Sequence, residues 1–454
     1  MRTILNLYSL TMNNTKLASN VIWRIWLVSI SLIFLSACTL NKQYHTQYDT
    51  CRTATPQAEC KSSTVVDFQD AADPDANYSL GFIEFDDQGQ LHDREQLSYL
   101  INDLYSRATD NSLLIVLFVH GWQHNAQHND RYVINFHETL RMLSQEESQA
   151  ARMEMREARQ IAGVYLGWRG RSLDIPVINA TTFWERKNTA HTVGRGGVAE
   201  VLSRLEEIRN LKTNIDQTKP MMQTRLVILG HSFGGAIVYT ALSQILMDRF
   251  VQTKGPVGIA SDARGFGDLV VLLNPAFEAT RFLSHRLMSN ERGHYFDSQL
   301  PVLAVLTSES DWATKYAFWA GRAASTLFNT YKDIKYVNKV TNKEEIISEG
   351  SANRTAIGHF KPIETHFLEY KPDAKVEDDM VTYQRVQAEW ETDAPNTSIE
   401  FNYSMLHHKN NSVGHNPYLI IKVDKRIIPN HSDIFSNEVG DFIRNFILLS
   451  VQDD

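Results

Sequence analysis

The sequence predicts an α/β fold in which helices flank a mostly parallel sheet. Short apolar runs alternate with longer amphipathic stretches from Tyr78 to the end of the 454-residue chain, a rhythm typical of this fold class. Some runs, such as LLIVLFV at 113–119, contain no polar residue, as expected for strands that are buried on both faces. With 43% hydrophobic and 22% charged residues, the composition is that of a folded globular protein rather than a disordered or multi-span membrane chain.

The expected elements follow one another along the chain. A strand at 79–85 closes at the turn DDQG, and 94–108 carries apolar residues at helical spacing. The later expected strands lie at 113–119, 161–166, 225–229, 269–273, 302–306 and 418–423, and the later expected helices at 131–159, 198–211, 234–250 and 437–449. Together these elements predict one α/β domain, the catalytic body, at 78–454.

One long segment, 312–416, interrupts this alternation. It shows no clear buried strand, and its first part is rich in aromatic side chains, namely Trp312, Tyr316, Phe318, Trp319 and Phe328. In an enzyme such an insertion is a candidate cap or lid over the site. The alternative interpretation is a surface excursion that shields an edge of the sheet.

The amino terminus has the pattern of a signal peptide. Residues 25–35 (IWLVSISLIFL) form an apolar run with Lys16 and Arg24 ahead of it. The run is shorter than the ~20 residues that a membrane span needs. An uncleaved anchor and an ordinary secretory signal are the alternatives to the more specific interpretation that follows.

The end of this run, Leu35-Ser36-Ala37-Cys38, resembles the bacterial lipoprotein signal. In that signal, small residues precede a cysteine that is lipidated and becomes the first residue of the mature protein. The resemblance implies that residues 1–37 are removed and that Cys38 carries the lipid. Because Thr39 rather than Asp follows the cysteine, it also implies an outer-membrane lipoprotein, facing the periplasm or the cell surface.

Residues 38–77 are expected to form a polar tether between the lipid and the catalytic body. Cys51 and Cys60 lie in this polar stretch, and export would place them in an oxidising compartment, where a pair this close can form a disulfide. Two free surface thiols are the alternative. The spacing is not that of a CxxC motif, and no His-Cys cluster indicates zinc.

The sharpest motif is Gly230-His231-Ser232-Phe233-Gly234. It lies directly after the expected strand 225–229 and directly before the expected helix 234–250, which is the setting of a nucleophile elbow. Without side chains at Gly230 and Gly234 the backbone can turn tightly while Ser232 presents its hydroxyl. The plainer interpretation is a glycine-rich turn with an idle serine.

A second segment, His120-Gly121-Trp122-Gln123, follows the strand at 113–119. With both segments, the chain resembles an α/β-hydrolase, in which a His-Gly loop after an early strand forms half of the oxyanion hole. The resemblance implies one donor at the N–H of Phe233 and the other at Trp122, with Gln123 as the alternative. The four-residue spacing of His120, His124 and His128 could suit a metal on a helix, but Gly121 and the strand end argue against that helix. We therefore predict no metal site.

The same resemblance implies the partners of Ser232, in the order Ser, acid, His along the chain. The second strand after that of Ser232 opens into Thr307-Ser308-Glu309-Ser310-Asp311, so Asp311 is the expected acid, with Glu309 and Glu278 as rivals. Of the histidines that follow, His431 alone falls between the last strand and the last helix and is the expected base. Its alternative interpretation is a polar residue near a helix start.

These residues predict a lipid-anchored serine hydrolase that cleaves a small-molecule or lipid carboxylic ester. Ser232 would attack the acyl carbon, His431 would carry the proton, and Asp311 would orient His431. The alternatives are a catalytically retired hydrolase fold that serves as a binding module, and an acyltransferase. The segment 194–197 (GRGG) lacks the spacing of a dinucleotide motif, so no cofactor is expected. A net charge of −8 without basic runs excludes a nucleic-acid partner.

Overall fold

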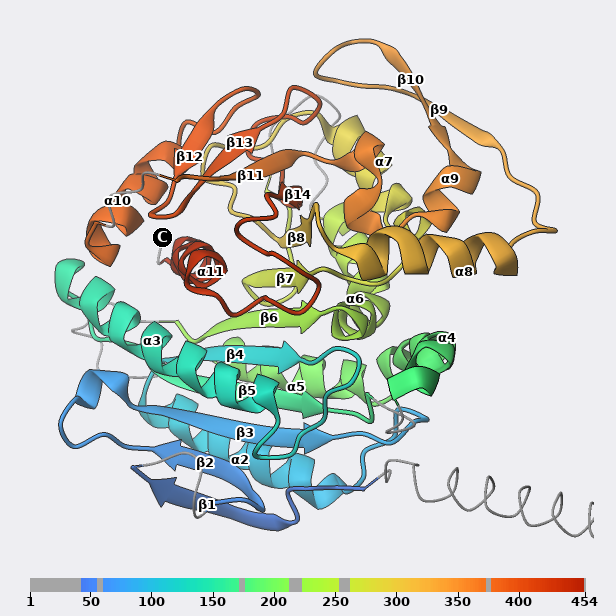
Figure 1. Cartoon of the computed structure of the whole chain (residues 1–454). Coiled ribbons are helices and arrows are strands. Elements are labelled where there is room, and N and C mark those ends of the chain that lie inside the picture. The colour runs from blue at the N-terminus through green and yellow to red at the C-terminus, as the bar shows by residue number, and fades with distance from the viewer. Residues whose placement is uncertain are drawn as a thin grey trace, which may run out of the picture.

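The computed structural model describes residues 42–54, 60–170, 176–211, 223–252, 262–372 and 377–452. The expected signal peptide and the lipidation site Cys38 lie outside these residues. Within them, no helix is both long and apolar enough to cross a membrane. Figure 1 shows a single large sheet with helices on both of its faces.

Twelve strands form this sheet, in the order β1-β2-β3-β5-β4-β6-β7-β8-β14-β11-β13-β12. All neighbours from β3 to β11 pair in parallel, whereas the pairs β2–β3, β11–β13 and β12–β13 are antiparallel. The expected α/β fold with a mostly parallel sheet is therefore confirmed. The strands are β1 (Gln47–Thr53), β2 (Ser63–Phe68), β3 (Tyr78–Glu84), β4 (Leu113–Val119), β5 (Gln160–Gly167), β6 (Arg225–His231), β7 (Leu269–Leu273), β8 (Leu303–Ser308), β11 (His366–Tyr370), β12 (Ser398–Glu400), β13 (Ser404–His408) and β14 (Tyr418–Val423).

Two apolar cores, one on each face of the sheet, hold the helices in place. Alternate residues of β4 enter the two cores, which explains why this strand is apolar throughout. Helices α2, α4, α5 and α6 contribute to one core, and α3, α10 and α11 to the other. The helices are α2 (Arg94–Asp110), α3 (Arg131–Met153), α4 (Pro176–Arg195), α5 (Val198–Arg209), α6 (Phe233–Gln252), α7 (Leu283–Arg292), α8 (Phe318–Ser325), α9 (Glu349–Arg354), α10 (Asp379–Trp390) and α11 (Asn437–Ser450).

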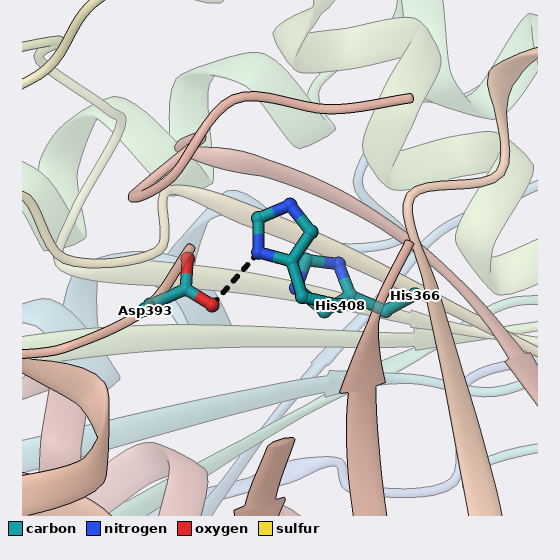
Figure 2. A group of neighbouring side chains, drawn as sticks. All are labelled: His366, Asp393 and His408. Carbon is teal, nitrogen blue, oxygen red and sulfur yellow. Dashed lines mark hydrogen bonds and ion pairs between the residues drawn. The ribbon is translucent and has the colours of Figure 1, made fainter. Parts of the chain in front are cut away.

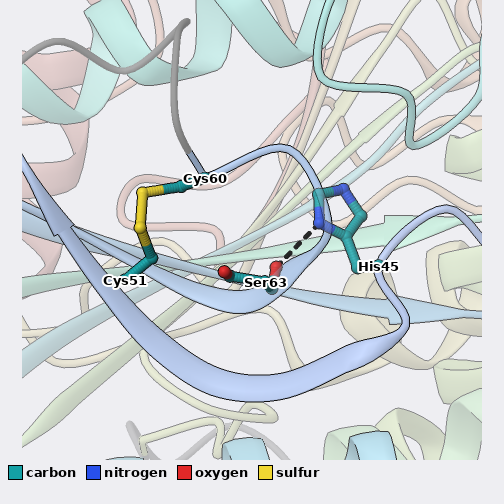
Figure 3. Close-up of a disulfide and its surroundings, with 4 residues drawn as sticks. All are labelled: His45, Cys51, Cys60 and Ser63. Carbon is teal, nitrogen blue, oxygen red and sulfur yellow. Dashed lines mark hydrogen bonds between the residues drawn. A yellow bond between two sulfur atoms is a disulfide. The ribbon is translucent and has the colours of Figure 1, made fainter.

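The prediction of a polar tether at 38–77 is wrong for its described residues. Strands β1 and β2 belong to the main sheet, β1 in parallel with β2 and β2 antiparallel to β3. Cys51 and Cys60 form the expected disulfide, and the His45 ring lies 2.8 Å from the Ser63 carbonyl oxygen (Figure 3). The buried Glu84 carboxylate accepts the N–H groups of Tyr44 (2.9 Å) and His45 (2.8 Å). Strands β1 (QYDTCRT) and β2 (STVVDF) contain too few apolar residues to be recognised as strands from the sequence.

The prediction that 312–416 lacks sheet strands is also wrong. Strands β11, β13 and β12 extend the main sheet beyond β14, so the second half of the segment forms the sheet edge itself. They were missed because they are short and only alternate residues of β11 and β13 are fully buried. The first half carries α8, α9 and a separate hairpin of β9 (Asp333–Val337) and β10 (Glu344–Ser348), which projects from the body in Figure 1.

We expect a chain that begins at Tyr78 to be far less stable than one that begins at Lys42. The shorter chain lacks the buried side chains of Val65, Val66 and Phe68 and leaves Glu84 without its backbone donors. Each lost apolar side chain costs about 1.5–3 kcal/mol, and an unpaired buried carboxylate adds to this. Thermal unfolding followed by circular dichroism measures the difference. Equal melting temperatures would restore the tether interpretation.

We expect the protein to lose stability as the pH falls from 7 to 5. Burial lowers the pKa of many histidines to about 3 or 4, among them His45, His120, His137, His191, His285 and His359. In the unfolded chain these rings take up protons near pH 6.5, whereas in the folded chain they do not. Each ring therefore lowers the free energy of unfolding by about 1.4 kcal/mol per pH unit below 6.5.

Three buried acids oppose this trend. Burial raises the pKa of Glu84 and Glu146 to about 7 and that of Asp441 to about 6. The folded chain therefore binds protons that the unfolded chain does not, and these acids raise the free energy of unfolding as the pH falls. Because the histidines outnumber them, we expect a net decrease of several kcal/mol. Urea unfolding at pH 7.5, 6.5 and 5.5 measures it. A free energy of unfolding that is constant or rises on acidification contradicts the expectation.

Candidate active site

Ser232 lies at the tight turn between β6 and α6. Its φ of 55° is in the left-handed region, which a non-glycine residue adopts only under constraint. A side chain at Gly230 would put a Cβ 2.9 Å from the Cα of Gly235, and one at Gly234 would collide with the carbonyl oxygen of Val119. The glycines predicted for the elbow therefore stand where the backbone has no room for a side chain.

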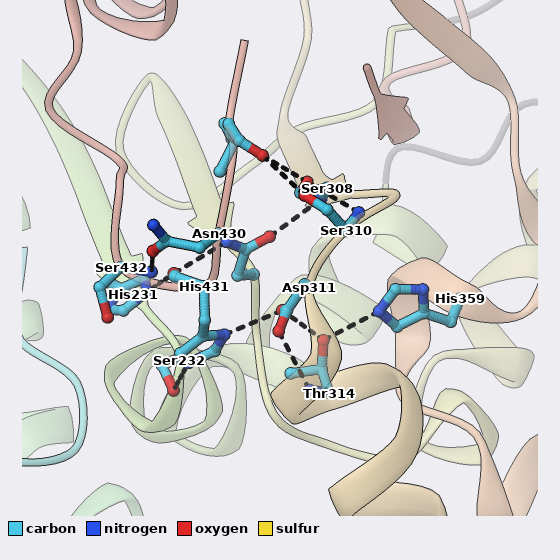
Figure 4. Close-up of polar contacts among 12 residues, drawn as sticks. His231, Ser232, Ser308, Ser310, Asp311, Thr314, His359, Asn430, His431 and Ser432 are labelled. Carbon is cyan, nitrogen blue, oxygen red and sulfur yellow. Dashed lines mark hydrogen bonds and ion pairs between the residues drawn. The ribbon is translucent and has the colours of Figure 1, made fainter. Parts of the chain in front are cut away.

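The structure brings together the three residues predicted to form a catalytic triad. His431 lies in the loop between β14 and α11, where it was expected. Its Nε2 is 2.7 Å from the Ser232 hydroxyl oxygen, and its Nδ1 is 2.9 Å from a carboxylate oxygen of Asp311 (Figure 4). With Nδ1–H donating to Asp311, Nε2 is free to accept the proton of Ser232.

Asp311 is the acid that contacts His431, and it is fully buried. Burial alone would raise the pKa of its carboxyl, but the charge and hydrogen bond of His431 and two hydrogen bonds from Thr314 lower it to about 2. The group is thus a carboxylate at neutral pH. Of its rivals, Glu278 is bound by Lys187 (2.7 Å) and by two arginines, and Glu309 is exposed.

The loop 120–123 passes directly over the turn of Ser232. A side chain on Gly121 would put a Cβ 2.9 Å from the Cβ of Ser232. The N–H of Gln123 donates to the Gly170 carbonyl (3.1 Å), which removes it as an oxyanion donor. For the N–H groups of Trp122 and Phe233, the described part of the chain supplies no backbone acceptor. These two are the donors that remain for an oxyanion.

His120 anchors this loop. Its Nε2 accepts the N–H of Trp168 (3.1 Å), and the indole N–H of Trp168 donates to the His120 carbonyl oxygen (2.9 Å). The two rings are stacked, with centroids 5.6 Å apart. Burial lowers the pKa of His120 to about 4, so the ring is neutral at pH 7. The side chain of His124 is bound to Asp130 (2.9 Å).

Two residues that the sequence did not single out hold the loop of His431. Its carbonyl oxygen accepts one hydrogen bond from the His231 Nε2–H (2.8 Å) and one from the Asn274 side-chain amide (2.9 Å). The Asn274 side-chain oxygen in turn accepts the N–H of Ser308 (2.9 Å). His231 belongs to the elbow motif and Asn274 directly follows β7, so both lie at the edge of the sheet where the carboxyl ends of parallel strands meet.

A hydrogen-bonded chain continues from Asp311 away from Ser232. The hydroxyl of Thr314, in the π-helical turn Ala313–Ala317, donates to Asp311. The same hydroxyl oxygen is 2.9 Å from Nε2 of His359 (Figure 4). Nδ1 of that ring is 2.8 Å from the Lys422 amine. Burial lowers the pKa of His359 to about 3 and that of Lys422 to about 8. A neutral His359 therefore accepts from Lys422 and donates to Thr314.

Aromatic side chains of α4, α6 and α8 pack together next to the loop 120–123. Phe183 of α4 contacts the rings of Phe233 (centroids 4.8 Å apart) and Trp122 (5.6 Å). The next residue, Trp184, contacts Phe318 at the start of α8 (5.9 Å). In Figure 1, α4 and α8 lie beyond the ends to which the central strands point.

No protein-family model, curated protein or solved structure matches the chain significantly. The chemistry of the site therefore follows from its own residues. A serine hydroxyl bonded to an imidazole that a buried carboxylate orients is an arrangement that makes the serine a nucleophile.

We expect Thr314→Val to slow the reaction of Ser232 with a fluorophosphonate probe by about tenfold. The substitution keeps the volume but removes a hydrogen bond that favours the ionised form of Asp311. The pKa of Asp311 therefore rises, and the loss of reactivity that protonation of Asp311 causes begins at a higher pH. Labelling rates across the pH range measure both effects.

Thr326→Val is the matched control, because the Thr326 hydroxyl is also buried but donates to the Arg322 carbonyl of its own helix (2.7 Å). It should label at the rate of the unaltered protein. A Thr314→Val rate that is reduced by the same factor at every pH would show a packing defect, and would contradict the assigned role of the hydroxyl.

Proposed function

We propose that this protein is a serine hydrolase of the α/β-hydrolase type that cleaves a carboxylic ester. Ser232 attacks the acyl carbon while His431 takes its proton and then delivers it to the leaving alcohol. Asp311 holds the tautomer of His431 and stabilises its charged form. The N–H groups of Trp122 and Phe233 receive the negative oxygen of the tetrahedral intermediate. Water then attacks the acyl-enzyme, with His431 as the base.

The observation that carries the proposal is the position of His431 between Ser232 and Asp311, at 2.7 Å and 2.9 Å. The three residues come from three separate segments of the chain, so their contact has no local cause. The left-handed backbone of Ser232 and the glycines around it support the same assignment.

The acyl group of the proposed substrate is apolar. Trp122, in the loop that lies against Ser232, is only half-buried, and burial of its exposed aromatic surface against an alkyl chain is favourable. Ser232 itself is only 1% exposed, so the ester bond is attacked in a site that excludes most water.

The proposed location is the cell envelope, with a lipid on Cys38 as the membrane anchor. The sequence of residues 25–38 supports it, as does the disulfide between Cys51 and Cys60, because such bonds persist in oxidising compartments. The active site would then be within reach of small-molecule esters and lipid esters at the membrane surface.

We expect p-nitrophenyl octanoate to be hydrolysed with an initial burst of one p-nitrophenol per active site, the sign of an acyl-enzyme. Ser232→Ala should abolish the burst and lower the rate by at least about a thousandfold, and Asp311→Asn should lower it by about 10⁴-fold. Glu309→Gln is the control and should leave the rate unchanged. Rates that are far higher for the acetate ester would contradict the apolar acyl site.

Two outcomes would favour the other interpretations. If an added alcohol traps the acyl group more efficiently than water does, the protein is an acyltransferase that uses the same acyl-enzyme. If folded protein neither hydrolyses esters nor reacts with a fluorophosphonate, and Ser232→Ala behaves as the unaltered chain, the proposal fails and a binding role takes its place.

A further inference from the structure

Two histidines face each other at the edge of the sheet, away from the triad. His366 begins β11 and His408 ends β13, and they are directly opposed in the antiparallel register of these strands. Their ring centroids are 4.3 Å apart (Figure 2). Both residues are almost fully buried, at 1% and 3% exposed. Residues paired across a sheet hold their side chains at a fixed separation, so this contact is built into the strand pairing.

A buried carboxylate completes the group. Asp393 lies in the connection between α10 and β12 and is 4% exposed. One of its oxygens is 2.8 Å from Nδ1 of His408, and the other accepts the backbone N–H of His415 (2.8 Å). Among the described residues, no Lys or Arg forms an ion pair with it. The nearby cation Lys409 is bound to Glu364 instead (2.7 Å).

Nε2 of His366 and Nε2 of His408 are both buried, and neither has a hydrogen-bond partner within the described part of the chain. An unsatisfied buried nitrogen is unfavourable, and two in one cluster need an explanation. An ordinary His-Asp pair accounts for Nδ1 of His408 but for neither Nε2. The free Nε2 of His366, together with Nδ1 of His408 and the carboxylate of Asp393, is a donor set that a transition-metal ion takes up.

We propose that His366, His408 and Asp393 bind one divalent transition-metal ion, with Zn²⁺ as the ion that fits this set best. Two imidazole nitrogens and one carboxylate oxygen are common zinc ligands, and a fourth position remains for water or another donor. The ion would take the place of the proton between Nδ1 of His408 and Asp393, which are 2.8 Å apart (Figure 2), so that both atoms become ligands. The site does not depend on the proposed hydrolase activity.

The geometry requires only a small adjustment on loading. One potential ligand atom from each residue lies within 4.8 Å of the other two. The ligand atoms of a tetrahedral zinc ion with bonds of about 2.0–2.1 Å lie about 3.4 Å apart. Rotations of the His366 and His408 rings and of the Asp393 carboxylate can close this gap, because the strands that carry the histidines are already paired.

Such an ion would bind together three segments of the sheet extension: β11, β13 and the connection that precedes β12. Strand β11 pairs with β14, and His366 of β11 lies opposite Ile421 of β14. The next residue of β14 is Lys422, which ends the hydrogen-bonded chain from Asp311. The ion would therefore stabilise the edge of the sheet that carries this chain.

The test is the zinc content and affinity of the untagged protein after dialysis against a weak chelator. We expect about one zinc per chain by mass spectrometry, a higher melting temperature with Zn²⁺ than without, and affinities at least about a hundredfold weaker in His366→Gln and His408→Gln. The matched control is His407→Gln, because His407 is the neighbour of His408 and is bound to Glu369 at the surface (2.9 Å). It should keep the zinc.

The proposal is overturned if the unaltered protein retains no zinc, or if His407→Gln loses as much zinc as His408→Gln does. If the ligand variants fail to fold, Co²⁺ titration of the unaltered protein decides instead. One equivalent of Co²⁺ with the visible absorption of a tetrahedral nitrogen–oxygen site, displaced by Zn²⁺, supports the site. The absence of this absorption overturns it. Because metal content is read independently of ester cleavage, failure here and failure of the hydrolase proposal are distinguishable.

Discussion

The close packing of the turn after β6 against the end of β4 is the constraint on which the rest of the site depends. At Gly234 the helix α6 starts so near to the Val119 carbonyl that no side chain fits, and at Gly121 the following loop runs against Ser232. The proposed nucleophile and the loop that carries one of the proposed oxyanion donors are thus positioned by one contact between neighbouring parallel strands.

The proposed base, His431, is held by a different means. His431 lies in a loop, and loops are the mobile parts of a fold, yet its backbone carbonyl is held by His231 from β6 and by Asn274 after β7. Since His231 precedes Ser232 directly, the segment that presents the nucleophile also fixes the base. Thr314, His359 and Lys422 similarly support Asp311 from the opposite side.

The central strands and the three triad residues could be predicted because their signals are local or strongly ordered. Strand 113–119 is apolar throughout, the elbow occupies five consecutive residues, and His431 is identified by its place between the last strand and helix. The strands toward both sheet edges could not be predicted, because β1 and β11 are partly exposed and mix polar with apolar residues. The support of Asp311 by His359 and Lys422, and the pairing of His366 with His408, arise from contacts between distant segments that no local pattern records.

The inclusion of β1 and β2 in the sheet changes the picture of how the protein would sit on a membrane. If Cys38 carries a lipid, only three residues lie between it and Lys42, where the described body begins, and the four residue-to-residue steps span at most about 14 Å. The folded domain would then lie against the lipid headgroups of the membrane rather than move away from them on a long flexible linker. Its choice of substrates would be set by the leaflet to which it is fixed.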